Sequence, residues 1–162
     1  LFVRPEHAAE TWTRLAARAR PVGAPAWDGL LVLAGIPTVL PQTQDQFVPQ
    51  MANMDALHGI SFNKGCYPGQ EVVARSQYLG QVKRRLYLAH VDADAEPGAD
   101  LYTPALPGQS CGTIANVAPA PEGGHDVLAV VRIEGIQADD VRLGSADGPR
   151  LSFKPLPYPL PA

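Results

Sequence analysis

Residues 84–91 read RRLYLAHV, and this stretch decides the fold. Apolar and polar side chains alternate along it, a period typical of a strand with one buried face. Residues 127–133 read VLAVVRI and form the best strand candidate in the chain. The two stretches predict a β-structure in the second half of the chain.

Shorter strand candidates surround this pair at 111–117, 141–143 and 151–153. Glycine and proline turns separate them, as at Pro97-Gly98 and in the hairpin-like segment 122–125. Closely spaced short strands with such turns are typical of a small antiparallel barrel or sandwich. The proline-rich tail, residues 155–161, suits neither sheet nor helix, and we expect it to lie extended over the surface.

The first half of the chain carries patterns of helices and loops rather than of a sheet. Helical spacing of Trp12, Leu15 and Ala19 predicts a helix over residues 6–20 with Trp12 in the core. Leu1–Val3 reads as the end of a strand. The apolar segment 27–34 fits either a buried strand or a short helix.

The remainder of this half predicts a polar loop over 41–50 and one or two helical turns over 51–57. Trp27 is expected in the core. The sequence pattern becomes strand-like near residues 78–84, where we place a boundary between an α/β part and a β part.

Composition excludes several protein classes. The 162 residues include 15 glycines and 17 prolines, too many for a long helical bundle. Hydrophobic residues make up 46%, enough for a real core, and the net charge of −3 argues against a protein held on nucleic acid mainly by phosphate contacts. Two cysteines and no long apolar run predict a cytoplasmic protein without a membrane span. The chain begins within an apolar run and without methionine, so we expect a fragment of a longer protein.

The densest chemical stretch is KGCYPGQE, residues 64–71. Pro68 suits the start of a helix, which places Glu71 in the first turn, where a negative charge is favourable. Cys66 then lies just before a helix N-terminus with Lys64 two residues away, and both features favour the thiolate form. Cys66 and Lys64 are therefore the catalytic candidates. The alternative is that Cys66 is a small buried hydrophobe in a tight turn.

Neighbouring residues would shape this loop or wall a ligand. The loop-shaping candidates are Gly65, Tyr67, Gly69, Gln70 and Glu71. Phe62, Tyr67 and Tyr78 flank the motif and could wall a planar ligand. No metal site built from this chain alone is expected, because no CxxC or HxxxH pattern occurs, and Cys111 is expected to be structural.

Basic residues form a further candidate surface. Lys83-Arg84-Arg85, together with Lys64 and Arg75, could make a basic patch. It is either a solvated strand edge or a dock for RNA or an anionic ligand tail.

The motif resembles the signature of the YgfZ-type folate-binding proteins. These are relatives of the glycine-cleavage T-protein, an aminomethyltransferase, and they include mitochondrial iron–sulfur assembly factors. Other segments that look like the bacterial branch are Ala34-Gly35-Ile36-Pro37, Phe47-Val48-Pro49-Gln50, Asn53, Gly59-Ile60-Ser61-Phe62, Val73-Ala74-Arg75 and Pro155-Leu156-Pro157-Tyr158.

The resemblance implies an α+β fold that is part of a three-part ring. Residues 1–80 would be the remnant of an α/β ferredoxin-like, T-protein-like middle domain that carries the motif. Residues 81–155 would form a small antiparallel β-barrel, and 156–162 an extended proline-rich tail.

The resemblance also implies a function. Family members bind tetrahydrofolate and support the assembly or repair of iron–sulfur enzymes, including a radical enzyme that thiomethylates tRNA, and the motif cysteine, here Cys66, is the residue on which this depends. Asn53, Phe62, Arg75 and Tyr78 would contact the folate, with no metal site. Leu33 departs from the polar residue that relatives often carry before the Ala-Gly-x-Pro segment, so that contact is not expected here.

We therefore expect a monomeric accessory factor whose partners are folate, iron–sulfur client enzymes and tRNA. Two other hypotheses remain open from the sequence. One is an aminomethyltransferase-like enzyme that transfers a one-carbon unit to tetrahydrofolate, against which the cysteine signature argues. The other is a tRNA-binding module that uses the basic strand at Lys83–Arg85.

Overall fold

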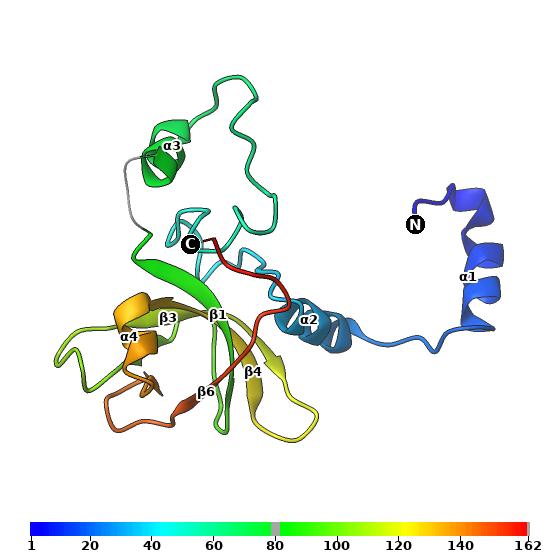
Figure 1. Cartoon of the computed structure of the whole chain (residues 1–162). Helices are drawn as coiled ribbons and strands as arrows, with labels where there is room; N and C mark the ends of the chain where they lie inside the picture. Colours follow the sequence, from blue (N-terminus) through cyan, green and yellow to red (C-terminus); the bar gives the residue numbers. More distant parts are fainter. Residues whose placement is uncertain (79–81, 162) are drawn as a thin grey trace.

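The computed structural model describes residues 1–78 and 82–161, with the backbone alone for Gln77 and Tyr78 (Figure 1). The fold is α+β. Its helical elements are η1 (Pro5–His7), α1 (Ala8–Ala16), α2 (Ala24–Leu33), α3 (Gln70–Tyr78) and α4 (Ile133–Gln137). Its strands are β1 (Arg84–Val91), β2 (Asp100–Tyr102), β3 (Gly112–Pro119), β4 (His125–Arg132), β5 (Arg142–Leu143) and β6 (Leu151–Lys154).

The strands form one antiparallel sheet in the order β5-β2-β3-β4-β1-β6. It curls into a half-barrel, as Figure 1 shows. Hydrogen bonds from the Leu151 amide to the Val141 carbonyl (2.8 Å) and from the Leu143 amide to the Pro149 carbonyl (2.9 Å) join the chain entering β6 to the region of β5. The chain just before β6 therefore pairs with β5 through the bridge between Arg142 and Arg150, so the two ends of the sheet approach each other.

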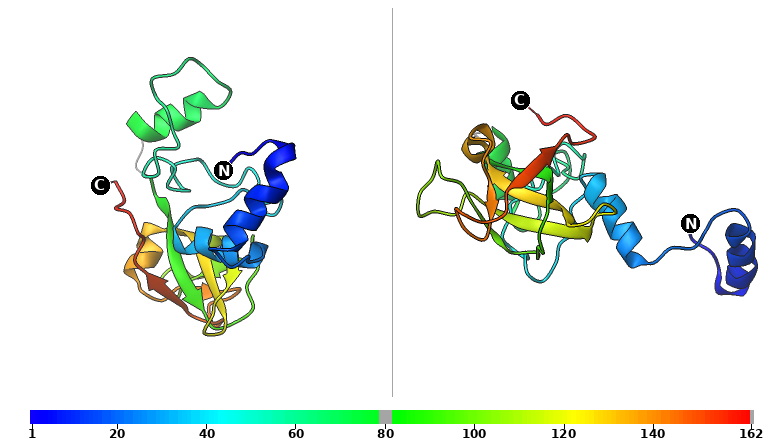
Figure 2. Two further views of the ribbon diagram at one scale, coloured as in Figure 1. Left: turned by 90° about the vertical axis from the view of Figure 1, so that its right-hand side faces the viewer. Right: turned by 90° about the horizontal axis from the view of Figure 1, so that it is seen from below.

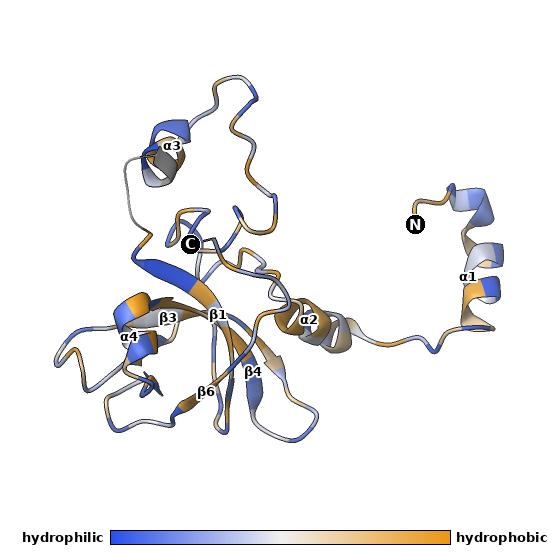
Figure 3. Ribbon diagram, in the orientation of Figure 1, coloured by the Kyte–Doolittle hydropathy of each residue, from blue (hydrophilic) through white to orange (hydrophobic). Residues whose placement is uncertain are grey.

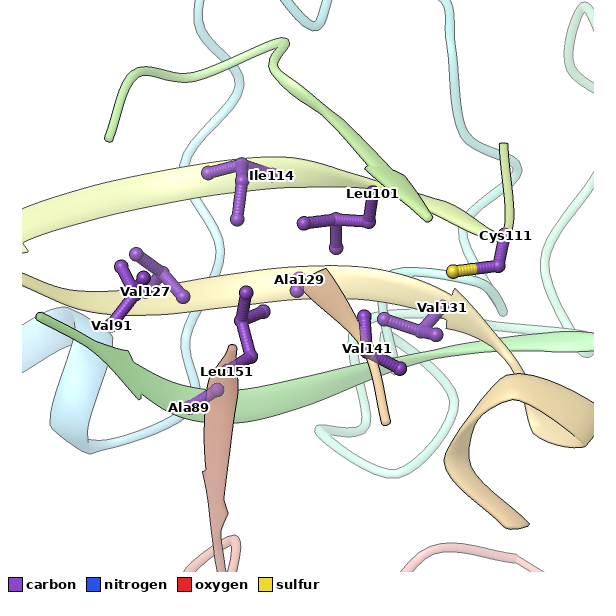
Figure 4. Close-up of a cluster of buried hydrophobic side chains, with 10 residues drawn as sticks. All are labelled: Ala89, Val91, Leu101, Cys111, Ile114, Val127, Ala129, Val131, Val141 and Leu151. Carbon is purple, nitrogen blue, oxygen red and sulfur yellow. The ribbon is translucent and has the colours of Figure 1, made fainter. Parts of the chain in front are cut away.

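The inside of the curl holds the main hydrophobic core. Its buried side chains point toward one another between the strands in Figure 4; they are Ala89, Val91, Leu101, Cys111, Ile114, Val127, Ala129, Val131, Val141 and Leu151. The predicted structural role of Cys111 fits this position, because the thiol is fully buried.

The outer face of β1, β3 and β4 carries a second cluster. Helix α2 packs on β3 and β4 through Val32, and Figure 3 shows its apolar end against the sheet. Phe47, Met51 and Leu156 add partly buried apolar surface to the same cluster. The outer face is thus covered by one helix, a layer of turns over residues 36–62 and the extended tail.

The first 33 residues differ from the prediction. Leu1–Val3 is an exposed segment without strand pairing among the described residues, and α1 ends at Ala16 rather than near residue 20. Residues 27–33 belong to α2, so of the two alternatives for segment 27–34 the helix is confirmed. Trp12 and Trp27 are 63% and 62% exposed, so the prediction that both lie in the core is wrong for this structure. Helix α1 lies apart from the sheet in Figures 1 and 2, which leaves its apolar side without a covering element among the described residues.

Two short elements were not predicted, β2 and α4, and segment 51–57 forms turns rather than an assigned helix. The described residues 1–78 contain no strand, so the predicted ferredoxin-like remnant is not confirmed. The predicted boundary after residue 80 falls in 79–81, outside the described residues. No helix in the described part of the chain is long and apolar enough to cross a membrane.

Candidate functional site

The motif forms a loop that leads into α3. Gly69 has a φ of +84°, a left-handed conformation that favours glycine, and α3 begins at the next residue. The Gln70 amide donates to the Tyr67 carbonyl (3.2 Å), and the Tyr67 amide donates to Gln70 Oε1 (3.4 Å). Gln70 therefore fixes the bend between the loop and the helix, and Glu71 lies in the first helical turn as predicted.

Cys66 is exposed on this loop. Apart from its chain neighbours Lys64 and Cys66, no residue has an atom within 4 Å of where a Cβ on Gly65 would stand, so the loop is open beside Gly65. The alternative that Cys66 is a buried hydrophobe is wrong; that description fits Cys111 instead. Lys64 places its Nζ 4.5 Å from the centroid of the Tyr67 ring. This cation–π contact joins the residue before Gly65-Cys66 to the residue after it.

A cavity of about 460 Å³ lies between the motif loop and the outer face of the sheet. Lys64 and Tyr67 line it from the loop, Val73 from α3 and Ala115 from β3. Phe47 and other residues of the turn layer form the remaining wall. The two residues that flank Gly65-Cys66 thus line one space, and Tyr67 is one of the aromatic residues that the sequence predicts beside a ligand.

Polar side chains hold the turn layer beneath this cavity. Gln50 is fully buried; its Nε2 donates to the Val73 carbonyl (2.7 Å), and its Oε1 has no partner among the described residues. The Gln50 carbonyl accepts from Arg85 Nη1 (2.9 Å), which also contacts both carboxylate oxygens of Asp55 at 2.7 and 2.8 Å. Gln50 thus connects α3 to β1.

Arg85 therefore does not belong to the predicted basic patch. It is 7% exposed and neutralised by Asp55, because the start of β1 turns this side chain under the layer rather than toward solvent. Lys83 is exposed and Arg84 is half-buried, so the charge of the patch is smaller than the sequence indicates.

Asn53 has a structural position. It is fully buried at a φ of +58°; its Nδ2 donates to the Leu86 carbonyl (2.8 Å), and its Oδ1 accepts from the Leu86 amide (3.3 Å). Nδ2 also lies 3.3 Å from the Tyr158 hydroxyl, which donates to the Gly35 carbonyl (2.7 Å). Both atoms of the side-chain amide are thus occupied by hydrogen bonds within the fold, and the contact of Asn53 with folate stays a prediction.

The other predicted folate contacts are scattered. Phe62 is half-buried beside the motif. Arg75 pairs with Glu71 at 2.8 Å on the exposed side of α3, where such a pair contributes little to stability. The side chain of Tyr78 lies outside the described residues. The structure brings Lys64 and Tyr67 together at the cavity and does not bring Arg75 there.

Most residues that line the cavity are not among the predicted site residues, and Asp45 and Phe47 are the two whose chemistry suits a ligand. Asp45 lines the cavity at a φ of +59°, a conformation that is uncommon for residues other than glycine. Phe47 also lines the cavity and belongs to one of the segments that carry the resemblance. No signal in the sequence marks Asp45.

Burial dominates the pKa shifts near the site. Burial raises the pKa of the Tyr158 hydroxyl, which the hydrogen bond to Asn53 opposes. Burial also raises the pKa of the Cys111 thiol, so Cys111 stays a neutral core side chain. No group of three or more His, Cys, Asp or Glu that could hold a metal occurs among the described residues.

Comparison with known proteins gives one consistent result. The chain is 36% identical over 157 residues to a protein of Edwardsiella ictaluri named "tRNA-modifying protein YgfZ", a match that covers 94% of this chain and 47% of that protein. A protein of the same name from Escherichia fergusonii is 36% identical over 163 residues, covering 99% of this chain and 50% of the relative. An Enterobacter protein of that name is 37% identical over 136 residues, covering 83% of this chain and 42% of the relative. The chain spans about half the length of the curated relatives it matches, and no family profile matches it.

Proposed function

Because this chain belongs to the YgfZ-type family, we propose that it is a tetrahydrofolate-binding accessory protein of the cytoplasm. It would support iron–sulfur enzymes that modify tRNA, and it would do so through the Cys66 thiol. One observation carries the proposal: the exposed Cys66 sits between Lys64 and Tyr67, which line a cavity large enough for a small molecule. The relatives' name supports the tRNA part.

The cavity residues suit a folate. A volume of about 460 Å³ is typical of small-molecule sites. The rings of Phe47 and Tyr67 offer flat surfaces to a pteridine, the Lys64 ammonium suits the carboxylates of the glutamate tail, and the Asp45 carboxylate suits ring N–H donors. When bound, tetrahydrofolate would carry a one-carbon unit; the chain's own residues would hold it and shield it beside the loop.

Calorimetric titration of the purified chain with tetrahydrofolate tests this part. We expect Lys64→Gln and Tyr67→Ala to weaken binding, each by about tenfold. Lys154→Gln removes the same charge from β6, which does not line the cavity, and should bind as the wild type does. Absence of binding by the wild-type chain would reject the folate part, and equal binding by all variants would reject this cavity as its site.

The thiol part is tested in cells that lack their own relative. These cells would express the wild-type chain, Cys66→Ser or Cys111→Ala, and methylthiolated tRNA nucleosides would be measured by mass spectrometry at matched protein abundance. We expect the wild type and Cys111→Ala to restore the modification and Cys66→Ser to leave it absent. Equal restoration by Cys66→Ser would show that the motif is a structural turn. Failure of the wild-type chain would reject the accessory role for this chain.

The ferredoxin-like assignment of residues 1–80 remains part of the proposal. Its support is the family resemblance together with the exposed apolar side chains of α1, Trp12 and Leu15, which suit packing against a further element. An experimental structure of a full-length relative tests it: strands that pair beside α1 would support the assignment, and their absence would reject it.

A further inference from the structure

The arginines of the half-barrel divide into two kinds. Among residues 82–154, three of the five have a carboxylate partner. These are Arg85 with Asp55 at 2.7 Å, Arg142 with Asp140 at 2.8 Å and Arg150 with Asp139 at 3.1 Å. Arg84 and Arg132 have neither a carboxylate nor a hydrogen-bond partner for their side chains within residues 1–78 and 82–161.

These two unpaired arginines face each other. Arg84 of β1 lies directly opposite Arg132 of β4 in the antiparallel register, and both are half-buried. Side chains directly opposite in such a pair project from the same face with Cβ atoms about 5 Å apart, and like charges there are destabilising. The sheet therefore places two arginine side chains next to each other on one face, and no carboxylate of the described residues pairs with either of them.

The opposite end of the same strand pair shows the contrast. His90 of β1 lies opposite Asp126 of β4, with His90 Nδ1 3.0 Å from Asp126 Oδ1. Lys154 of β6 donates to the same oxygen at 2.7 Å. Charges are matched at that end and unmatched at the arginine end, so the fold is able to pair charges across these strands and does not do so at Arg84.

The unmatched charge has the chemistry of a phosphate site. A guanidinium group presents several N–H donors in a planar fork that matches phosphate oxygens, and two adjacent forks can share one or two phosphates. Lys83 precedes Arg84 and is exposed, which adds a third cation next to the pair. Burial raises the pKa of the Cys111 thiol, and the positive charges of Arg132 and Arg84 partly oppose that increase. Their positive potential therefore reaches the core of the half-barrel.

We propose that Arg84 and Arg132 form a clamp for the phosphate backbone of RNA. This inference rests on the proposed function for its choice of RNA as the phosphate source. The net charge of −3 limits the interaction to a few contacts, so the affinity is modest and depends on these two side chains rather than on the charge of the whole surface.

Fluorescence anisotropy with labelled bulk tRNA tests the clamp on the 162-residue chain. We expect Arg84→Gln and Arg132→Gln each to weaken binding about tenfold and to reduce the salt dependence by about one counterion. Arg150→Gln loses the same charge from an ion-paired arginine and should bind within about twofold of the wild type. Equal weakening by all three variants would overturn the proposal, because it would show a general charge effect, and so would a lack of tRNA binding by the wild type.

A charge reversal separates binding from folding. Arg132→Glu places a carboxylate opposite Arg84, so the variant should unfold at a urea concentration no lower than that of the wild type, yet lose tRNA binding. Arg84→Lys keeps the charge without the fork and should retain only part of the affinity. Wild-type binding by Arg132→Glu would overturn the clamp.

Competition identifies the anion. Millimolar inorganic phosphate should displace tRNA from the wild type and not alter the residual binding of Arg84→Gln. Displacement by a tetraglutamate peptide but not by phosphate would assign the pair to a carboxylate tail and overturn the RNA proposal. Cys66→Ser should bind tRNA normally. If that variant loses cellular tRNA modification while its tRNA binding is intact, the loss is due to the thiol and leaves the clamp untouched. Unchanged tRNA binding by Arg84→Gln and Arg132→Gln would reject the clamp without affecting the proposed role of the thiol.

Discussion

The half-barrel and the turn layer that carries the motif are stabilised by different interactions. Inside the curl, ten apolar or sulfur-containing side chains are at most 2% exposed. Between residues 36 and 72, by contrast, the buried side chains are Thr43, Gln50 and Asn53, all of them polar. Burial of apolar area is non-directional and tolerates small shifts, whereas hydrogen bonds fix distances and angles. The position of the motif therefore depends on a few polar side chains, and loss of one should affect the layer before the sheet.

The largest effect on stability is expected from Arg85→Met, which removes the ion pair with Asp55 that joins β1 to the turn layer. Asp55 would lose its only ion-pair partner within the described residues while remaining largely buried. Removing one member of a buried pair typically costs about 3 to 5 kcal/mol. Urea denaturation followed by circular dichroism measures the loss, and hydrogen exchange locates it.

We expect amide protection to fall across residues 49–57 and much less in β4. The double variant Arg85→Met with Asp55→Leu removes both charges and should recover part of the stability. An equal loss of protection in β4 and in the turn layer would show that the two regions unfold as one unit. It would contradict the claim that different interactions stabilise them separately.

A smaller effect is expected from Asn53→Ala. The substitution removes two hydrogen bonds to Leu86 and places alanine at a φ of +58°, with an expected loss of about 2 to 3 kcal/mol. Asn53→Gly removes the same hydrogen bonds but tolerates this φ, so it should unfold at a urea concentration above that of the alanine variant. If the two variants were equally stable, the backbone conformation would contribute nothing measurable.

The tail is expected to contribute less. Tyr158→Phe removes the hydroxyl that donates to the Gly35 carbonyl and contacts Asn53, which should cost about 1 kcal/mol. Leu156 still packs on the outer cluster in this variant, so the sheet should be unaffected. Limited proteolysis should cut the tail faster than in the wild type, and an unchanged rate would show that Leu156 alone holds it.

The smallest effect concerns acid stability at the matched end of the sheet. Burial opposes the charge of Asp126, but hydrogen bonds from Lys154 and His90 outweigh it, so the pKa of Asp126 lies below its ordinary value. A lowered carboxyl pKa stabilises the fold above the unfolded value near pH 4, and this contribution is lost as the pH falls through the lowered pKa.

Lys154→Gln should therefore move the acid loss of stability to higher pH, with a cost at neutral pH under about 1 kcal/mol because Lys154 is 41% exposed. Urea midpoints measured from pH 7 to pH 3 give both quantities. Ser152→Ala, on the same strand, is the control and should follow the wild-type profile. Parallel pH profiles for wild type and Lys154→Gln would show that His90 alone stabilises the ionised Asp126.

The sequence predicts the long strands and the short strands β5 and β6, but it does not predict β2 and α4. The stretches that became β1, β3 and β4 carry apolar patterns over eight residues each, long enough to be distinguished from loops. Strand β2 has three residues and α4 has five, and so short a segment has no readable period. These elements form because hydrogen bonds from neighbouring strands, such as the Cys111 amide to the Leu101 carbonyl (2.7 Å), order them.

Two incorrect predictions, for Arg85 and Trp12, also arise because the sequence does not show which parts of the chain come together. Arg85 follows Arg84 and was assigned to one basic patch, because sequence proximity does not show that adjacent strand residues face opposite sides. The helical spacing of Trp12 with Leu15 and Ala19 predicts a buried face, yet nothing in the described chain covers α1. The motif is correctly predicted to lead into a helix with Glu71 in its first turn, but α3 begins at Gln70 rather than at Pro68, because Gly69 has a φ of +84° and interrupts the helical path.

The sequence by itself determined the features that depend on local or periodic interactions: the long strands, the helix after the motif, the extended tail and the membership of a family through KGCYPGQE. Only the tertiary structure decided which polar groups meet. The cavity beside Lys64 and Tyr67, the bond between Asn53 and Leu86 and the opposed pair Arg84 and Arg132 each join residues of different elements. Such contacts depend on strand register and on the path of the turns, and these are set by the packing of the whole sheet rather than by any single segment.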